Sequence, residues 1–376
     1  MITKLNIANF KSHKDTELNL GNLTLLTGLN STGKSTIIQS FLLLRQSFKK
    51  GRLNKGLDLN EPLCDIGKGV DALYRFANES EIISFEIEIN KNETHTFNFN
   101  AKDKYEETFI PNLTEISINE EQQKLPFFTN NFQYLSANRI AGVEFYPLDS
   151  YAVEEEKQIS RNYGQGELVA HFLEFYGENR DFNIELDLLL HPENTSRKLL
   201  DQVIAWEREI SPRITMIPSK KGDKVIIEYG YKSKGDFMPI ENLKSKNIGF
   251  GISYSLSIIV ALLSAKPGAL ILIENPEAHL HPKGQSKLAE LICLAAQSNI
   301  QVIVETHSDH IFNGIRKGIY SNKIENKNAR IYYFETDDRN TSKSTEIEIS
   351  EKGRILNYKE GFFDQFDNDL DELIGL

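Results

Sequence analysis

Residues 28–36, Gly-Leu-Asn-Ser-Thr-Gly-Lys-Ser-Thr, place two glycines, a lysine and several hydroxyl groups at the spacing of a phosphate-binding loop. Glycine lets the backbone approach a β-phosphate closely. Successive N–H groups that lead into a helix then form an anion cradle. We expect Lys34 to reach the β- and γ-phosphates and Ser35 to hold Mg²⁺. The residues predicted to bind nucleotide here are Gly28, Asn30, Ser31, Thr32, Gly33, Lys34, Ser35 and Thr36.

Carboxylates follow two apolar stretches in the second half of the chain. Residues 269–274 read as a buried strand that ends in Glu274. A carboxylate at the end of a strand beside a phosphate loop is a typical Mg²⁺ site, and burying it without a partner is costly. An ion pair with a nearby Lys or Arg is the alternative interpretation. A second strand, 300–305, ends in Glu305 and is followed by His307, which can donate to a γ-phosphate.

Residues 247–253 form a second glycine-rich segment before an apolar helix at 256–263. Gly249, Gly251 and Ser253 there indicate another anion-binding helix N-terminus. A helix start in which the glycines serve only packing is the alternative, because a short glycine pattern is weak evidence.

The elements around these residues follow from hydrophobic periodicity. Residues 23–27 predict a buried strand before the phosphate loop, and apolar residues from 37 to 44 predict the helix after it. Residues 2–10 alternate as an edge strand does. Period-two patterns predict antiparallel strands at 82–89, 94–99, 115–118 and 132–136, and hairpins at 214–229 and 330–349. Helical spacing predicts helices at 168–176, 186–190, 199–206 and after 309, the last capped by Ser308 and Asp309.

These elements predict an α/β fold with one nucleotide-binding unit in two pieces. Residues 1–50 and 247–376 form the nucleotide-binding core. An antiparallel β-rich insertion occupies 51–140, and a mainly helical lobe with a hairpin occupies 141–246.

Composition narrows the functional classes. The net charge of −11 argues against a general nucleic-acid binder and leaves room only for a short basic groove. Two distant cysteines and the lack of a signal pattern fit a reducing cytoplasm. The longest apolar stretch, 252–265, is too short and too polar to span a membrane.

Four motifs in order resemble the ABC-type ATPase heads of the SMC-like and overcoming-lysogenisation-defect-like superfamily, in particular small bacterial AAA-type ATPases that lack a coiled-coil arm. These motifs are Asn9–Ser12 with the phosphate loop, the segment Asn247–Ser253, the run Glu274–Pro282, and Glu305–Ser308. The resemblance covers most of the chain and includes Gly361–Asp364. It implies a P-loop NTPase fold of the ABC-head type.

The resemblance also implies roles for these residues. Glu274 matches the acidic Walker B residue on the Mg²⁺ side, and His307 matches the switch histidine. Gly249, Gly251 and Ser253 match the signature segment, which touches the γ-phosphate bound by a partner subunit. ATP would then lie between two heads of a homodimer. His281 would fall in a loop at that interface.

One departure concerns the catalytic base. Asn275 stands where such heads carry a glutamate, and an amide does not accept a proton as a carboxylate does. Glu277 or Glu305 therefore takes this role, with Glu277 favoured, or hydrolysis is slow. A glutamine-loop residue is expected within 60–67.

Two other groupings are less informative. His279, His281, His307 and His310, with nearby carboxylates, have ligand types that zinc accepts but not a closed four-ligand spacing. Arg139, after the strand at 132–136, fits a structural ion pair better than a phosphate contact.

The sequence thus predicts a cytoplasmic ATPase head that uses ATP and Mg²⁺, with Glu277, Glu274 and His307 as catalytic residues. The resemblance implies a setting in prokaryotic anti-phage defence or DNA maintenance, with a separate nuclease or toxin as effector. The alternative is a nucleotide-gated scaffold with little turnover that controls such an effector. A DNA-engaging clamp is a further rival.

Overall fold

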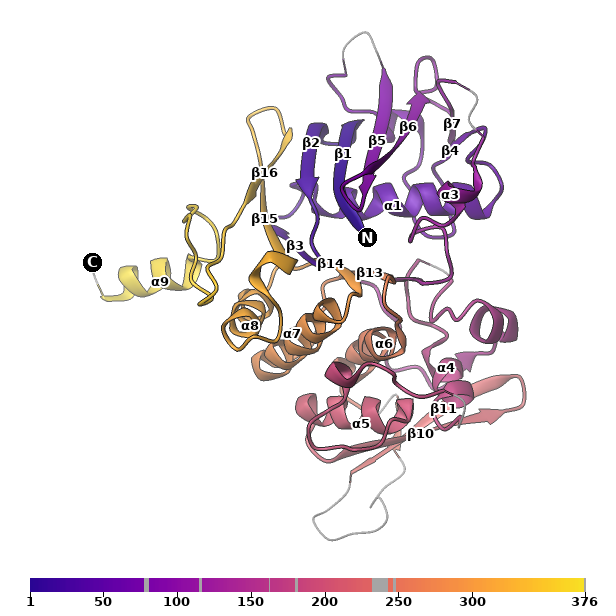
Figure 1. Cartoon of the computed structure of the whole chain (residues 1–376), viewed down its shortest axis with the longest axis vertical. Coiled ribbons are helices and arrows are strands. Elements are labelled where there is room, and N and C mark those ends of the chain that lie inside the picture. Colours follow the sequence, from indigo (N-terminus) through magenta and orange to yellow (C-terminus); the bar gives the residue numbers. More distant parts are fainter. Residues whose placement is uncertain are drawn as a thin grey trace.

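A central sheet of six strands organises the computed structural model, in the order β16-β15-β3-β14-β13-β8 (Figure 1). The neighbours from β15 to β8 pair in parallel, and β16 pairs antiparallel to β15. The structure describes residues 1–77, 81–114, 117–161, 163–179, 182–231, 243–245 and 248–374. The strand bounds are β3 (Leu23–Gly28), β8 (Phe132–Leu135), β13 (Leu270–Glu274), β14 (Gln301–Glu305), β15 (Ala329–Thr336) and β16 (Ser342–Glu346).

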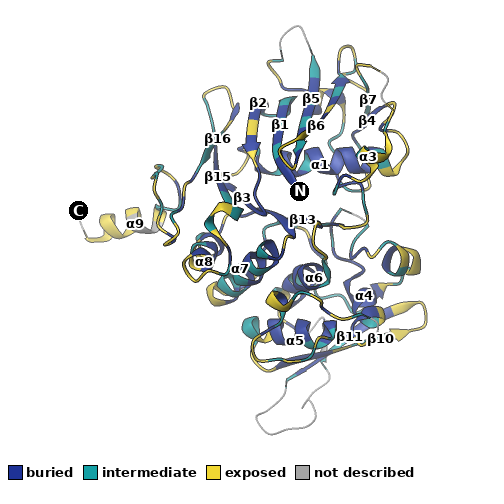
Figure 2. Cartoon of the chain, in the orientation of Figure 1, coloured by how far each residue is buried: buried dark blue, intermediate teal, exposed yellow. Residues whose placement is uncertain are grey.

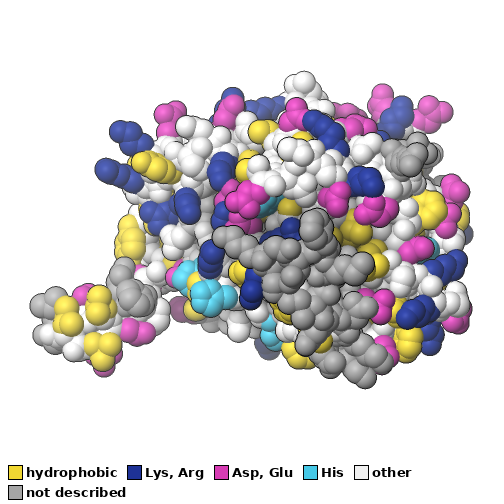
Figure 3. Space-filling model, turned by 90° about the horizontal axis from the view of Figure 1, so that it is seen from below, with side chains coloured by type: hydrophobic (Ala, Val, Ile, Leu, Met, Phe, Trp, Pro, Cys, Tyr) yellow, Lys and Arg dark blue, Asp and Glu magenta, His cyan; other side chains and the backbone are white. Residues whose placement is uncertain are grey.

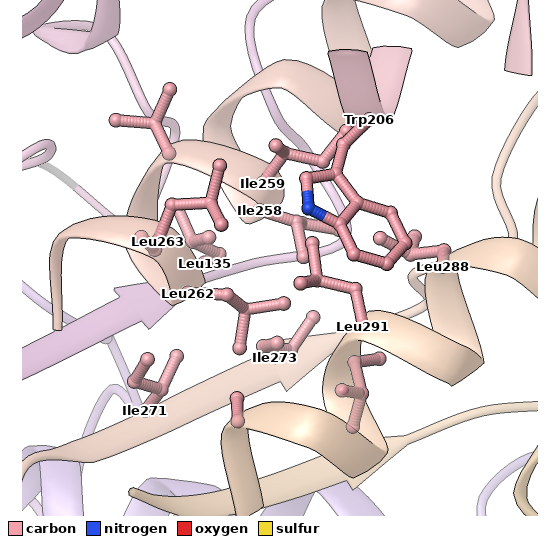
Figure 4. Close-up of a cluster of buried hydrophobic side chains, with 14 of the residues drawn as sticks. Leu135, Trp206, Ile258, Ile259, Leu262, Leu263, Ile271, Ile273, Leu288 and Leu291 are labelled. Carbon is pink, nitrogen blue, oxygen red and sulfur yellow. The ribbon is translucent and has the colours of Figure 1, made fainter. Parts of the chain in front are cut away.

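The central sheet separates two hydrophobic cores because its side chains alternate between the faces. Leu270 and Leu272 pack into the core that contains α1 (Lys34–Lys49), whereas Ile271 and Ile273 pack into the core on the opposite face. Figure 4 shows this second core, where Ile271 and Ile273 lie among aliphatic side chains in the same cluster as Trp206. Its helices are α6 (Phe250–Ser264), α7 (Pro282–Gln297) and α8 (Asp309–Tyr320).

An antiparallel sheet covers the α1 side, in the order β2-β1-β5-β6 (Figure 1). Its strands are β1 (Ile2–Phe10), β2 (His13–Asn19), β5 (Ile82–Ile89) and β6 (Glu93–Asn100). The predicted edge position of residues 2–10 is wrong, because β1 lies between β2 and β5 and is buried at Ile2, Leu5 and Ile7. Residues 132–136 were also expected in the antiparallel region, yet β8 is a parallel edge strand of the central sheet. A short apolar run does not reveal its partner strand.

Smaller elements complete the α1 side. They are β4 (Gly56–Asp58), α2 (Gly69–Ala72), β7 (Phe109–Pro111) and α3 (Glu120–Gln123). The strand expected at 115–118 falls partly on residues 115 and 116, which lie outside the described residues.

The opposite side holds the predicted helices and hairpin. Residues 168–176 and 199–206 form α4 (Val169–Tyr176) and α5 (Leu199–Ile210), and 186–190 contain a single 3₁₀ turn, Asp187–Leu189. The hairpin consists of β10 (Ile214–Lys221) and β11 (Lys224–Tyr231), and β11 also pairs with β9 (Tyr146–Pro147) and β12 (Leu243–Lys244). A π-helical turn, Tyr151–Glu155, lies near α4. Figure 2 shows the buried faces of these helices turned inward.

The last hairpin leads into the C-terminal part of the chain. The second strand of the last hairpin is β16 at 342–346, not 346–349, because Ser342 pairs with Thr336 directly after a short turn. The chain then ends in α9 (Gln365–Ile374), which projects from the body (Figure 1). Apolar side chains show on this projection in Figure 3, and Leu370, Leu373 and Ile374 are exposed.

Candidate nucleotide-binding site

The phosphate loop joins the end of β3 to the start of α1, as the sequence predicts. Gly28 has φ +138°, and a Cβ there would lie 2.1 Å from the carbonyl oxygen of Phe334. Gly33 has φ +97°, and its Cβ would lie 2.2 Å from Ser342 Oγ. Both positions therefore require glycine for sterics and for backbone conformation.

Two side chains far from the loop in sequence hold it in place. Ser342 Oγ donates to the Thr32 carbonyl at 2.8 Å, and His13 Nε2 donates to the Gly33 carbonyl at 3.0 Å. Burial lowers the pKa of His13 to about 4, so the ring is neutral, and its Nδ1 accepts from Thr16 Oγ1. The sequence analysis did not single out His13 or Ser342. The adjacent Asn9–Ser12 motif was the available signal for His13.

Lys34 keeps its ammonium group at the loop. Its Nζ donates to the Gly28 carbonyl at 3.1 Å and to the Leu29 carbonyl, and burial lowers its pKa. No ion pair between Lys34 and a carboxylate is found within the described part of the chain. The cation therefore remains available to an anion in the loop.

Ser35 contacts Glu305, and Glu274 has other hydrogen-bond partners. Its Oγ donates to Glu305 Oε1 at 2.8 Å, whereas Glu274 accepts from Tyr134 Oη and from the Ala137 N–H. Glu274 and Glu305 are directly paired residues of β13 and β14. Burial, followed by the charge of Glu274, raises the pKa of Glu305 to about 7, and burial raises the pKa of Glu274.

Glu277 lies in the loop that follows β13, and residues of the loop after β14 donate hydrogen bonds to it. Its Oε2 accepts from Thr306 Oγ1 at 2.7 Å, and its Oε1 accepts from the His307 N–H at 2.9 Å. The His307 side chain is exposed, and burial, followed by the charge of Lys34, lowers its pKa. Ser308 caps α8 by accepting from His310 and Ile311, as predicted, whereas no such bond from Asp309 supports the cap.

The phosphate loop and the carboxylates that end β13 and β14 line one cavity of about 610 Å³. It contains the predicted Glu274 and His307 together with Glu305. Ala137 follows β8 and lines the cavity, whereas residues 60–67, where a glutamine-loop residue was expected, do not. Glu277, Gly249, Gly251 and Ser253 are also outside the lining. The lining residues are Lys11, Ser12, Asn30, Ser31, Thr32, Gly33, Lys34, Ser35, Thr36, Gln39, Ala137, Glu274, Asn275, Glu305 and His307.

The glycine-rich segment lies at the N-terminus of α6, apart from the cavity; residue 247, its predicted start, is outside the described residues. Gly249 is exposed, and a Cβ there would meet nothing within 4 Å. At Gly251 a Cβ would lie 2.6 Å from the His279 carbonyl oxygen, which is the packing role considered above. Phe250 between them is 58% exposed. One glycine is thus free of steric demands within the chain, and the other is not.

Arg139 pairs with backbone carbonyls, and within the described ranges it forms no ion pair with a carboxylate. The side chain is buried and donates to four backbone carbonyls, those of Ser136, Tyr254, Glu274 and Asn275. Arg139 therefore joins the end of β13 to α6.

A family model matches residues 23–313, and its description reads "AAA domain, putative AbiEii toxin, Type IV TA system". The chain belongs to this family. A second model, for a family described only as a protein of unknown function, matches residues 324–373. Both the phosphate loop and the β14 carboxylate lie within the family's matched region.

Over 122 residues the chain is 30% identical to the DNA double-strand break repair Rad50 ATPase of Saccharolobus solfataricus, a match covering 32% of the chain and 13% of that protein. Among solved structures, an Smc head bound to the C-winged helix domain of ScpA has a TM-score of 0.56 at 15% identity and covers 92% of this chain and 98% of that one. The SMC head of Thermotoga maritima has a TM-score of 0.48 at 10% identity over 93% and 99% of the two chains.

The family model, the Rad50 match and the Smc head with a TM-score of 0.56 confirm the predicted α/β P-loop fold. They also confirm the predicted resemblance to ABC-type, SMC-like ATPase heads. No helix in the described ranges is long and apolar enough to cross a membrane. Nor do the described residues contain three or more His, Cys, Asp or Glu side chains grouped to hold a metal ion.

Proposed function

We propose that the chain binds ATP with Mg²⁺ in the cavity at the phosphate loop and hydrolyses it. The observation that carries this proposal is the convergence of Lys34, Ser35, Glu274, Glu305 and His307 on one cavity behind a glycine-dependent loop. The family and the Rad50 relative support the same activity.

The residues present fit both groups. Gly33 lets the loop backbone pack directly against Ser342 and His13, and Lys34 supplies a cation without a carboxylate partner in the described structure. The hydroxyl of Ser35 and the two strand-end carboxylates are the oxygen ligands that Mg²⁺ prefers. Bound Mg²⁺ neutralises charge on the phosphates during phosphoryl transfer.

The chain's own residues divide the remaining work. Lys34 and the loop N–H groups bind and orient the phosphates, and His307 donates a hydrogen bond toward the terminal phosphate. The backbone N–H of His307 is held by Glu277, so the backbone that carries the imidazole ring has a defined position in the loop. We keep the role of Glu277 as general base as a proposal. Both of its oxygens already accept hydrogen bonds, from Thr306 and from the His307 N–H.

We propose further that ATP joins two copies of the chain. Gly249 and Phe250 are exposed at the start of α6 and lie outside the chain's own cavity. A second copy that brings this segment to the phosphates would complete the site.

The biological setting that we propose is prokaryotic genome defence or DNA maintenance, with a separate nuclease or toxin as effector. The family description names a toxin of a toxin–antitoxin system, and the relative is named for DNA repair. Asn275 favours a second candidate, a nucleotide-gated scaffold with little turnover, because its amide lines the cavity where a proton acceptor is needed. DNA retention that falls steeply with salt would support a DNA clamp instead.

Nucleotide binding, mass and single-turnover hydrolysis of the purified chain test these proposals together. We expect ATP binding, a doubling of mass with ATP, and turnover, all lost in Lys34→Ala. Lys49→Ala at the other end of α1 is the matched control, because Lys49 pairs only at the surface with Glu156 and Asn130. Binding and dimerisation without turnover would favour the scaffold. Absence of ATP binding by the wild type would refute the proposal.

A further inference from the structure

Two carboxylates lie side by side at the carboxyl ends of two neighbouring strands of the central sheet, next to the phosphate loop. Glu305 ends β14 and Glu274 ends β13, and the two residues are direct partners in the parallel register. On its other side β14 pairs with β3, so that Glu305 and not Glu274 stands on the strand next to the one that carries the loop. The position of both side chains is therefore set by the sheet and not by a flexible loop.

The bonding of Glu305 is incomplete. Its side chain is 95% buried, since its exposed fraction is 5%. Oε1 accepts from Ser35 Oγ at 2.8 Å, but Oε2 is buried and has no hydrogen-bond partner. Among the described residues, Glu274 accepts only from the neutral Tyr134 Oη at 3.1 Å and the Ala137 N–H at 3.2 Å. Neither carboxylate forms an ion pair with a Lys or Arg in the described structure.

A buried carboxylate oxygen without a partner is unfavourable, and two neighbouring carboxylates increase that cost. A divalent cation compensates both, and a hard cation prefers a set of carboxylate and hydroxyl oxygens. In P-loop NTPases the loop supplies one hydroxyl ligand, and one acidic residue at the end of a separate strand completes the protein's share. Here the hydroxyl of Ser35 is already bonded to a second acidic residue, and all three side chains come from ordered elements.

We propose that Glu305 is a carboxylate ligand of the divalent cation, and that Ser35, Glu274 and Glu305 bind the cation before any nucleotide arrives. This inference rests on the proposed function in placing the cation in the phosphate-loop cavity, and goes beyond it in the ligand set and the order of binding. Three oxygen-bearing side chains are assembled in the chain alone and water can fill the remaining positions, so nucleotide phosphates are not needed to recruit the metal.

Binding of Mn²⁺ alone to the full chain, freed of nucleotide, tests this inference. Free Mn²⁺ is measured by its electron paramagnetic resonance signal, and stability is followed by thermal melting. We expect one bound Mn²⁺ that Mg²⁺ displaces and that raises the melting temperature. Glu305→Gln and Glu274→Gln should each weaken Mn²⁺ binding about 10-fold or more, on the scale of lost metal-site interactions. Ser35→Ala is a second variant, which removes only the hydroxyl ligand and leaves both carboxylates in place.

Glu277→Gln is the matched control, because Glu277 is a nearby carboxylate whose two oxygens are both engaged by Thr306 and His307. Its Mn²⁺ affinity should fall much less than that of Glu305→Gln, because Glu277 acts on the cation only through its charge and not as a ligand. Lack of Mn²⁺ binding by a wild type that still binds ATP would overturn this inference and leave the proposed function intact. Unchanged Mn²⁺ affinity in Glu305→Gln would likewise overturn it. Conversely, Mn²⁺ binding without any ATP binding would refute the proposed function alone.

Discussion

Glu277 accepts a hydrogen bond from the backbone N–H of His307 at 2.9 Å, and so ties the loop after β13 to the loop after β14. Its other oxygen accepts from Thr306 Oγ1 at 2.7 Å. The carboxylate thus fixes the backbone at His307.

Glu277→Gln tests whether this positioning is the main role of Glu277. Glutamine keeps one acceptor oxygen, so we expect single-turnover hydrolysis to fall less than about 10-fold, whereas Glu277→Ala leaves two donors unpaired and falls further. Removal of a general base typically lowers the rate about 10²–10⁴-fold. A loss of that size in a well-folded Glu277→Gln with normal ATP affinity would restore the predicted base role.

Arg139 is expected to be a large contributor to stability. Its guanidinium is buried and donates to carbonyls on three segments, including those of Glu274 and Tyr254. Arg139→Ala leaves these carbonyls without donors, and we expect a loss on the order of 3 kcal/mol in the free energy of unfolding. Arg139→Lys should recover only part of it, because an ammonium lacks the planar fork. Urea unfolding measures both.

Arg330→Ala is the control for Arg139. The Arg330 side chain is 42% exposed and pairs at the surface with Glu346. Exposed ion pairs contribute about 0–1 kcal/mol, so its unfolding midpoint should barely move. Equal effects of the two substitutions would show that the carbonyl contacts of Arg139 carry no special weight.

Substitutions at Gly249 test the proposed dimer contact without disturbing the fold of the chain. A side chain at Gly249 meets nothing within 4 Å and its φ of −57° suits any residue, whereas Gly251 packs against the His279 carbonyl. We expect Gly249→Gln to melt like the wild type and to bind ATP as a monomer, but to lose the ATP-dependent doubling of mass. Gly249→Ser, a small residue favoured at a helix N-terminus, should retain it. Dimerisation of Gly249→Gln at wild-type ATP concentrations would argue against the interface.

The sequence predicted the local parts of the site and missed the parts that depend on which strands are neighbours. The glycines, Lys34 and the strand–loop–helix order are encoded within a few residues, and all lie as expected. The partner of Ser35 depends on β14 lying between β3 and β13, which brings Glu305 to the loop in place of Glu274. The same non-local pairing placed β8 in the central sheet and gave Arg139 its carbonyl partners.

Glu207 on α5 gives a pH dependence that is independent of the nucleotide site. The side chain is fully buried and accepts from Ser255 Oγ at 3.0 and 3.2 Å. Burial raises the pKa of Glu207 from 4.5 to about 8, and the bond from Ser255 only partly opposes this. Between these two pH values the folded chain binds a proton that the unfolded chain has lost.

Because the folded state holds more protons, the share of stability due to Glu207 falls as pH rises from 4.5 toward 8. The slope is about 1.4 kcal/mol per pH unit, which amounts to ~3 kcal/mol by pH 7. Glu207→Gln stays neutral, so we expect the difference between the variant and the wild type to grow in favour of the variant across this range. Urea unfolding at pH 5, 6, 7 and 8 measures it. A difference that is constant with pH, or that grows toward acid, would contradict a protonated buried Glu207.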